Sequence, residues 1–282
     1  MKNYLIVTKN ERELQNPFTT ELKKYIEDKG GVAEVVARPR DDSNLGITVP
    51  EGVEGIFTIG GDGTLVRAAQ MTFESNVPLM GVNHGHLGYL CDLNEDSVYP
   101  AIDRMFANDY EIEERMMLSG YVIRSNGEKT PIQHSLNDIV VSSDDGKSVI
   151  RLTVYINGEY LYSIQGDGMI FATPTGSTAY NLSANGPIVD PKTEAILMTP
   201  INPHTLNSRS IVLDSEDEIS IEITPRRQTA VEAATVLFDG SFPYNMVPGD
   251  RLVVRKSNRK TKMIFMSKMN FLQRMRNKMQ EN

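Results

Sequence analysis

The chain has 282 residues, of which 40% are apolar, and its 29 Lys and Arg against 37 Asp and Glu give a formal net charge of −8. This acidic balance argues against nucleic acid or an anionic membrane as a partner, and no run of about 20 apolar residues is present to predict a membrane-spanning helix. The single cysteine, Cys91, excludes an internal disulfide framework and a multi-thiolate zinc site, and it fits a cytoplasmic location. The length suggests about two domains.

Strand-like and helical patterns alternate through the first 110 residues. Short apolar runs predict strands at 4–8, 32–36, 55–59 and 77–82, and apolar residues at helical spacing predict helices at 19–29, 65–71 and 98–106. Strands that alternate with helices need crossover connections, which give a mostly parallel sheet covered on both faces. We therefore expect an α/β domain over residues 1–110.

Alternation of period two dominates after about residue 110 and predicts a mainly antiparallel β domain over residues 111–266. The extended patterns at 151–156 and 159–164 flank Asn157-Gly158, a pair that favours the type I′ turn of a two-residue hairpin. A second hairpin is predicted from the extended patterns at 211–214 and 218–223. Two later strands are predicted at 252–254 and 263–265.

The last segment, residues 267–282, carries a helical pattern over 271–280. Phe271, Leu272 and Met275 fall on one side of this helix, which is therefore expected to pack onto the first domain. Basic residues are frequent towards this end of the chain and are expected to face solvent. They are Arg255, Lys256, Arg259, Lys260, Lys262, Lys268, Arg274, Arg276 and Lys278.

A glycine-rich turn, Gly60-Gly61-Asp62-Gly63-Thr64, lies between the third predicted strand and the second predicted helix. Glycines let a ligand approach the backbone closely, and the free N–H groups at a helix start favour phosphate. A carboxylate beside phosphates would repel them unless it accepts a proton or acts through a metal ion. The turn therefore predicts a phosphate site with Asp62 as proton acceptor, the alternative being a structural turn that Asp62 caps.

A loop of small hydroxyl residues is the second unusual stretch, where an apolar strand leads into Thr173-Pro174-Thr175-Gly176-Ser177-Thr178-Ala179-Tyr180. Hydroxyl groups donate and accept hydrogen bonds, so such a loop can hold a ribose or a phosphate, and a helix over 177–183 would add free N–H groups. The pair Asn137-Asp138 suits a ribose diol or an adenine edge. A capped β-to-helix turn and a simple Asx turn are the structural alternatives for these two segments.

Together these segments resemble the NAD kinase family over nearly the whole chain. The glycine–aspartate turn is shared with lipid kinases and phosphofructokinases, whereas the run from Thr173 to Tyr180 is highly specific. Further matching segments are 81–90, 136–138, Asp167-Gly168, 203–206, Arg209 and Asp239-Gly240. Four sites depart from the family pattern. Asp138 stands where Glu is more usual, Asn185 replaces a glycine, Ser241 stands where Gln is common, and Gln165-Gly166 precede Asp167 where some members carry Arg.

The resemblance implies an N-terminal Rossmann-like (phosphofructokinase-like) α/β domain, a β-rich NAD-binding domain, a C-terminal helix returning to the first domain, and a nucleotide site between domains and across subunits. The implied reaction transfers the terminal phosphate of ATP, or of another donor such as polyphosphate, to the adenosine ribose 2′-hydroxyl of NAD, giving NADP, with Asp62 as general base. The donor would lie on Gly60, Gly61, Gly63 and Thr64. NAD would be bound by Asp62, Gly63, Arg67, Asn137, Asp138, Asp167, Thr178, Ala179, Tyr180, Asn181, Leu182, Ser183 and Asn202.

A divalent cation, expected to be Mg²⁺, would bridge the donor phosphates, and the resemblance favours a homo-oligomer, a dimer or tetramer. The sequence shows no compact carboxylate cluster, so the phosphates are expected to hold most of the ion. His84, His86 and Cys91 are expected to serve a loop and not a metal. Two other functions stay open: a lipid kinase, which would need a membrane-facing surface, and a dinucleotide sensor, which would bind NAD without turnover.

Overall fold

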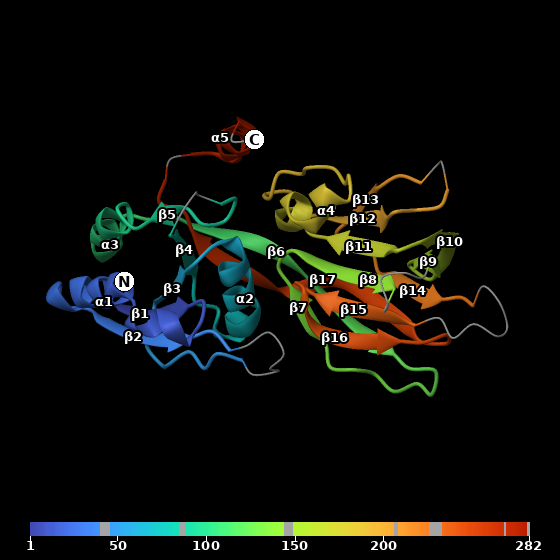
Figure 1. The fold of residues 1–282 in the computed structure, drawn as a ribbon, viewed down its shortest axis with the longest axis horizontal. Coiled ribbons are helices and arrows are strands. Elements are labelled where there is room, and N and C mark those ends of the chain that lie inside the picture. The colour runs from blue at the N-terminus through green and yellow to red at the C-terminus, as the bar shows by residue number, and fades with distance from the viewer. Residues whose placement is uncertain are drawn as a thin grey trace. The chain divides into compact units, whose positions relative to one another are not determined.

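The structure is a computed structural model that describes residues 1–39, 46–84, 88–143, 149–205, 208–225, 233–267 and 269–280. The chain divides into two compact units (Figure 1). Unit 1 comprises Met1–Arg115 and Lys260–Asn282, and unit 2 comprises Met116–Arg259. No helix within the described ranges is long and apolar enough to cross a membrane.

Unit 1 is built on a parallel sheet with strand order β2-β1-β3-β4-β5. The strands are β1 (Asn3–Thr8), β2 (Val32–Ala37), β3 (Gly55–Ile59), β4 (Leu79–Asn83) and β5 (Leu93–Asn94). The helices are the 3₁₀ turns η1 (Glu11–Gln15) and η2 (Phe73–Ser75) and the α-helices α1 (Pro17–Asp28), α2 (Asp62–Thr72), α3 (Val98–Phe106) and α5 (Phe271–Gln280). The predicted α/β domain is therefore confirmed.

Local sequence signals explain where the first helix begins. The Asn16 side chain accepts a hydrogen bond from the N–H of Phe18 (3.0 Å), and Pro17 opens the first turn, where a missing N–H costs nothing. Leu22 and Ile26 lie four residues apart on the inner face of α1, and both side chains are completely buried. They join a core that includes Tyr4, Ile6, Phe57, Ile59, Met80, Val82, Ile102 and Ile264.

Unit 2 contains two mainly antiparallel sheets with a continuous core between them. One has the order β13-β12-β11-β8-β15-β16, and the other includes β10-β9-β14-β17 together with β6 and β7. The strands are β6 (Ile112–Ile123), β7 (Gln133–Ser135), β8 (Asp138–Ser143), β9 (Ile150–Ile156), β10 (Glu159–Gly166), β11 (Gly168–Ala172), β12 (Ala195–Ile201), β13 (Ile211–Asp214), β14 (Ile219–Ile223), β15 (Ala234–Phe238), β16 (Ser241–Met246) and β17 (Arg251–Ile264). Leu118, Ile139, Phe171, Ile221 and Phe238 are among the core residues. The predicted antiparallel β domain is confirmed.

The hairpin predicted at Asn157-Gly158 is confirmed. Asn157 and Gly158 have φ values of 52° and 82°, and they join β9 directly to β10. Positive φ at both central positions is the requirement of a type I′ turn. The register pairs Glu159 with Ile156.

Three predicted elements differ from the structure. The hairpin expected from 211–214 and 218–223 is wrong, because β13 pairs with β12 in one sheet whereas β14 pairs with β9 and β17 in the other. The strands expected at 252–254 and 263–265 are a single strand, β17, whose buried Ser257 hydroxyl bonds the His134 ring (2.8 Å). Helix α2 begins at Asp62 itself, not after the turn. Helix α5 belongs to unit 1, as expected, with Phe271 and Met275 half-buried and Leu272 61% exposed.

Candidate functional site

Asp62 opens α2 at the carboxyl end of β3, with Gly61 as the residue before the helix. Gly60 has a φ of 145°, and a Cβ there would overlap the Thr64 hydroxyl, so this position needs glycine. The local chain therefore turns sharply from strand to helix and presents the N–H groups of the first helical turn, where anions are favoured. The predicted turn from strand to helix is present, with the helix beginning within the turn at Asp62.

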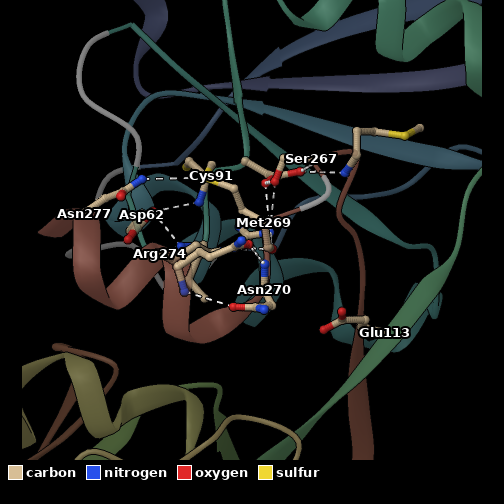
Figure 2. A network of polar contacts seen from close by, with 12 residues as sticks. Asp62, Cys91, Glu113, Ser267, Met269, Asn270, Arg274 and Asn277 are labelled. Atoms are coloured by element: carbon tan, nitrogen blue, oxygen red, sulfur yellow. Dashed lines mark hydrogen bonds and ion pairs between the residues drawn. The ribbon is translucent and has the colours of Figure 1, made fainter.

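Three consecutive backbone N–H groups hold the Asp62 carboxylate. Tyr89 donates to Oδ2 at 2.7 Å, while Leu90 and Cys91 donate to Oδ1 at 3.2 and 2.8 Å (Figure 2). Gly88 lies so close that a Cβ there would overlap the same carboxylate. An ionised carboxylate has about four acceptor sites, and Oδ2, which accepts one backbone N–H, is the oxygen better placed to receive a further donor.

Cys91, the single cysteine, is fully buried beside this carboxylate. Its thiol lies 3.5 Å from the Gly60 carbonyl oxygen. Burial raises the pKa of the Cys91 thiol far above its usual range, and the charge of Asp62 and a hydrogen bond to it raise that pKa further. The thiol is therefore neutral and serves packing. The His84 ring Nδ1 lies 2.6 Å from a carboxylate oxygen of Glu95 and shares a hydrogen bond with it, and His86 lies outside the described residues.

A second three-donor arrangement occurs in unit 2 at Asp239. Its carboxylate accepts hydrogen bonds from the backbone N–H groups of Leu136 (2.7 Å), Asn137 (2.8 Å) and Asp138 (3.0 Å). Asp239 and Gly240 form the two-residue turn between β15 and β16, with φ values of 48° and 70°. A tight turn in one hairpin therefore fixes the start of β8, where the predicted Asn137-Asp138 pair lies.

Asp138 is a buried acid, only 6% exposed. Burial is the main cause that raises the pKa of Asp138 to about 8, and the charge of Asp239 adds to the effect. Asp138 therefore carries a proton near neutral pH in the free protein and can donate a hydrogen bond. Within the described part of the chain, the neighbouring Asn137 Oδ1 is buried without a hydrogen-bond partner.

The hydroxyl loop packs directly against this pair. The Thr173 N–H donates to the Asn137 carbonyl oxygen (2.8 Å), and the Thr173 hydroxyl donates to the Leu136 carbonyl oxygen (2.6 Å). Gly176 has no space for a Cβ because the Asn137 carbonyl oxygen occupies it. The loop continues into η3 (Thr175–Thr178) and the short helix α4 (Tyr180–Ser183). Two motifs that stand more than 30 residues apart in the sequence thus form one cluster.

The remaining predicted residues divide into exposed and buried groups. Thr178 and Ala179 are half-buried, whereas Tyr180, Leu182 and Ser183 are exposed. Asn181 is fully buried, and its amide bonds the Ser177 and Pro187 carbonyl oxygens and the Thr199 hydroxyl, which marks a structural role for the side chain. Arg67 is buried in α2 and donates to Gln70 (2.6 Å).

Asp167 and Asn202, predicted from separate segments, lie side by side in unit 2. The Asn202 amide donates to Asp167 Oδ2 at 2.8 Å, and the Asp167 N–H donates to the Ile201 carbonyl oxygen at 3.0 Å. Asn202 has a φ of 42°, which asparagine tolerates better than most residues. The pair presents a carboxylate and an amide together at the end of β12.

A cavity of about 520 Å³ lies in unit 1 where β1 and β2 end. Among the described residues it is lined by Lys9, Asn10, Glu11, Arg12, Ala37, Arg38 and Pro39, three of which are cationic and one acidic. The carboxyl ends of parallel strands are the usual ligand-binding edge of such sheets. No group of three or more His, Cys, Asp or Glu within the described ranges could hold a metal ion.

The sequence reasoning assigned no role to several residues that shape these sites. Gly88 lay within a matching segment, but only the structure reveals its contact with Asp62. Asp239 likewise matched the family without an assigned partner. Asp92 and Arg274, which form a buried ion pair, gave no local signal, and Arg274 was expected to face solvent. Contacts between residues so distant in the sequence leave no pattern in either segment.

Comparisons with known proteins agree with this architecture. A yeast NADH kinase complexed with NADH is similar with a TM-score of 0.85 and 24% identity, covering 100% of this chain and 88% of that one. An NAD kinase from Archaeoglobus fulgidus in complex with ATP gives 0.75 and 23%, covering 99% of this chain and 98% of that one. These likenesses concern the fold alone.

The sequence comparisons resolve the family. Family models for the ATP-NAD kinase N-terminal and C-terminal domains match residues 5–110 and 136–266. The NAD kinase of Agathobacter rectalis is 41% identical over 283 residues, covering 99% of each chain, and that of Magnetococcus marinus is 32% identical, covering 99% of this chain and 93% of the relative. The chain belongs to the NAD kinase family.

Proposed function

We propose that the protein transfers the terminal phosphate of ATP to the 2′-hydroxyl of the adenosine ribose of NAD, producing NADP, with Asp62 as general base. The observation that carries this proposal is the Asp62 carboxylate, held by the N–H groups of residues 89–91 at the start of a helix. A fixed carboxylate with an acceptor site on Oδ2 suits a hydroxyl group whose proton must leave.

The proposed step conserves atoms and charge. The 2′-oxygen forms a bond to the terminal phosphorus as the bond from that phosphorus to the bridging oxygen of ATP breaks, and ADP takes the electron pair. The hydroxyl proton passes to Asp62 Oδ2. Positioning and charge neutralisation dominate phosphoryl transfer, so a rigidly oriented acceptor is more useful than a strong base.

Recognition of NAD is assigned to residues of unit 2. The buried Oδ1 of Asn137 and the protonated Asp138 offer an acceptor and a donor next to each other, which suits an adenine edge or a ribose diol. The Asp167–Asn202 pair supplies a carboxylate and an amide for a second polar part of the ligand. Thr178, Ala179, Tyr180, Leu182 and Ser183 remain proposed contacts, and Asn181 would contribute through its backbone.

The donor phosphates are proposed to lie on Gly60, Gly61, Gly63 and Thr64 around the start of α2. The N–H groups of Gly60 and Thr64 already donate to the carbonyl oxygens of Val82 and Gly61 (2.9 Å each), so the N–H groups of Gly61 and Gly63 are the proposed phosphate donors. The cationic cavity beside β1 and β2 is a fitting place for further donor phosphates, because Lys9, Arg12 and Arg38 line it. A divalent cation, proposed to be Mg²⁺, would arrive bound to the donor and neutralise phosphate charge. The described residues form no group of three or more His, Cys, Asp or Glu for such an ion, and we propose that the phosphates hold most of it. We also propose that the protein works as a homo-oligomer.

The test is the production of NADP from NAD, ATP and Mg²⁺, with diacylglycerol as the alternative acceptor. Asp62→Asn should lower kcat roughly 10²- to 10⁴-fold, the usual size of general-base catalysis, while the Kd for NAD measured by calorimetry changes little. Asp96→Asn, at an exposed acid of the same unit, is the matched control. Full activity of Asp62→Asn would refute the assigned base, and phosphorylation of diacylglycerol alone would favour a lipid kinase.

A further inference from the structure

A buried acid directly after the loop that holds Asp62 has no part in the mechanism above. Asp92 is 5% exposed and accepts hydrogen bonds from the backbone N–H groups of Met266 (2.5 Å) and Ser267 (2.6 Å) and from the Ser267 hydroxyl. Its Oδ1 also forms an ion pair with Arg274 of α5 at 2.9 Å. One acid thus ties the loop to a segment 174 residues later in the chain.

Arg274 is itself held in place from several directions. Its guanidinium lies over the Phe265 ring, 4.4 Å from the centroid, and donates to the Met269 carbonyl oxygen and the Ser267 hydroxyl (Figure 2). Only 10% of its side chain is exposed. Phe271 and Met275 of α5 are half-buried, and Arg274 is the residue that joins the helix to Asp92 by an ion pair. The helix thus places a cation at Asp92.

Hydrogen bonds at the start of α5 fix the first turn of the helix, which carries Arg274. The Asn270 side chain accepts from the Gln273 N–H, and the Gln273 side chain accepts from the Asn270 N–H, both at 2.9 Å. This reciprocal pair is a capping box, which satisfies two otherwise free donors at a helix start. Arg274 follows immediately, and its own N–H bonds the Asn270 carbonyl oxygen (3.1 Å).

Residues 88–92 link the Asp62 carboxylate to Asp92, and this short segment is tightly packed, so that a shift at one end is passed to the other. The N–H of Cys91 donates to Asp62, and the next residue is Asp92, so one peptide unit separates the two anchors. On the other side, Gly81 leaves no room for a Cβ because Cys91 and Leu65 occupy that space. A shift at Asp92 therefore moves the N–H groups that orient Asp62.

We propose that Asp92 and Arg274 are positioning residues for the phosphoryl transfer, because together they fix the loop whose N–H groups hold Asp62. This inference rests on the proposed role of Asp62 as general base. The two residues do not contact substrate. They act on the turnover rate through the placement of one carboxylate, and a misplacement of about 1 Å at a reacting group can cost about 10²-fold in rate.

The first test compares single variants of the full chain. Arg274→Gln and Asp92→Asn should each lower kcat by about tenfold to 10²-fold, with the KM for NAD and for ATP changed less than about twofold, because the effect concerns catalysis and not binding. Arg274→Lys, which keeps the charge but loses the planar fork, should recover part of the loss. Arg276→Gln, an exposed arginine on the same helix, is the matched control and should keep full activity.

A double-mutant cycle separates positioning from a general loss of structure. If Arg274 acts through Asp62, Arg274→Gln should have no further effect on kcat in the Asp62→Asn background. An equal loss in both backgrounds would overturn the inference, as would full kcat in folded Arg274→Gln. Should that variant fail to fold, Ser267→Ala, which keeps both backbone donors, is expected to lower kcat by a smaller factor in the same pattern, and full kcat there would overturn the inference too. Full activity of Asp62→Asn alone would instead refute the proposed function.

Discussion

The backbone of Gly88 lies against the carboxylate of Asp62, so closely that no side chain fits between them. Gly88→Ala should therefore displace either the carboxylate or the loop that donates to it. We expect kcat to fall by about 10²-fold with little change in the Kd for NAD. Gly46→Ala is the control, because a Cβ there would meet its nearest neighbour, the Met71 carbonyl oxygen, at an ordinary 3.6 Å. An active Gly88→Ala enzyme would show that the carboxylate tolerates movement.

Removal of the Asp239 carboxylate should disturb NAD binding rather than turnover. Asp239→Ala leaves the N–H groups of Leu136, Asn137 and Asp138 without this acceptor, and each unsatisfied buried donor costs roughly 1–3 kcal/mol. We expect a lower midpoint of urea unfolding and a raised Kd for NAD by calorimetry. Asp217→Ala, at a half-buried acid in a turn of the same unit, is the control. Unchanged values for Asp239→Ala would mean that another group replaces the acceptor.

Asp138 should make the stability of the ligand-free protein fall as the pH rises. Burial and the Asp239 charge raise the pKa of Asp138 from 3.8 to about 8, so between these pH values the folded protein holds a proton that the unfolded chain has lost. The free energy of unfolding then decreases with pH, by at most about 1.4 kcal/mol per pH unit for one proton.

The check is urea unfolding from pH 5 to pH 8, with Asp138→Asn beside the wild type. The variant cannot lose a proton at this position, so its stability relative to the wild type should increase steadily with pH. Parallel curves for the two proteins would show that Asp138 is ionised in the folded state. The comparison cancels the contributions of all other titrating groups.

The thiol of Cys91 should be inert in the folded protein. Because burial raises its pKa and the side chain is fully buried, alkylation by iodoacetamide at pH 8 should follow the opening of unit 1 and not direct reaction. We expect labelling in urea and almost none in buffer, measured by mass spectrometry. A variant with an exposed cysteine, such as Glu51→Cys, supplies the reactive control. Rapid labelling of the native wild type would show that the loop at Asp62 opens readily.

Much of the fold follows from patterns within single segments. The Asn157-Gly158 turn and the strands beside it could be predicted because turn chemistry and alternation agree there. The failed hairpin at 211–223 has equally good alternation, but β13 and β14 face the same core from opposite sheets. Alternation records which side of a strand is buried and does not record which strand lies beside it.

The site shows the same division. Asp62 and the Asn137-Asp138 pair could be identified because glycines and polar residues stand next to them in the sequence. The spacing of Phe271, Leu272 and Met275 predicts an apolar side of helix α5, of which Phe271 and Met275 are half-buried. The attachment of this helix through Arg274 depends on an acid in another segment, and the sequence of either segment alone contains no sign of it.

The discontinuity of unit 1 has a consequence for how the protein is made. Asp92 leaves the ribosome long before Ser267 and Arg274, since all of Met116–Arg259 is translated between them. Domains fold largely as units during synthesis, at about 5–20 residues per second, so unit 2 has time to fold while the first segment still lacks its final partners. The enzyme would thus complete its amino-terminal unit last, and a nascent chain would gain activity only after residues 267–274 have been made.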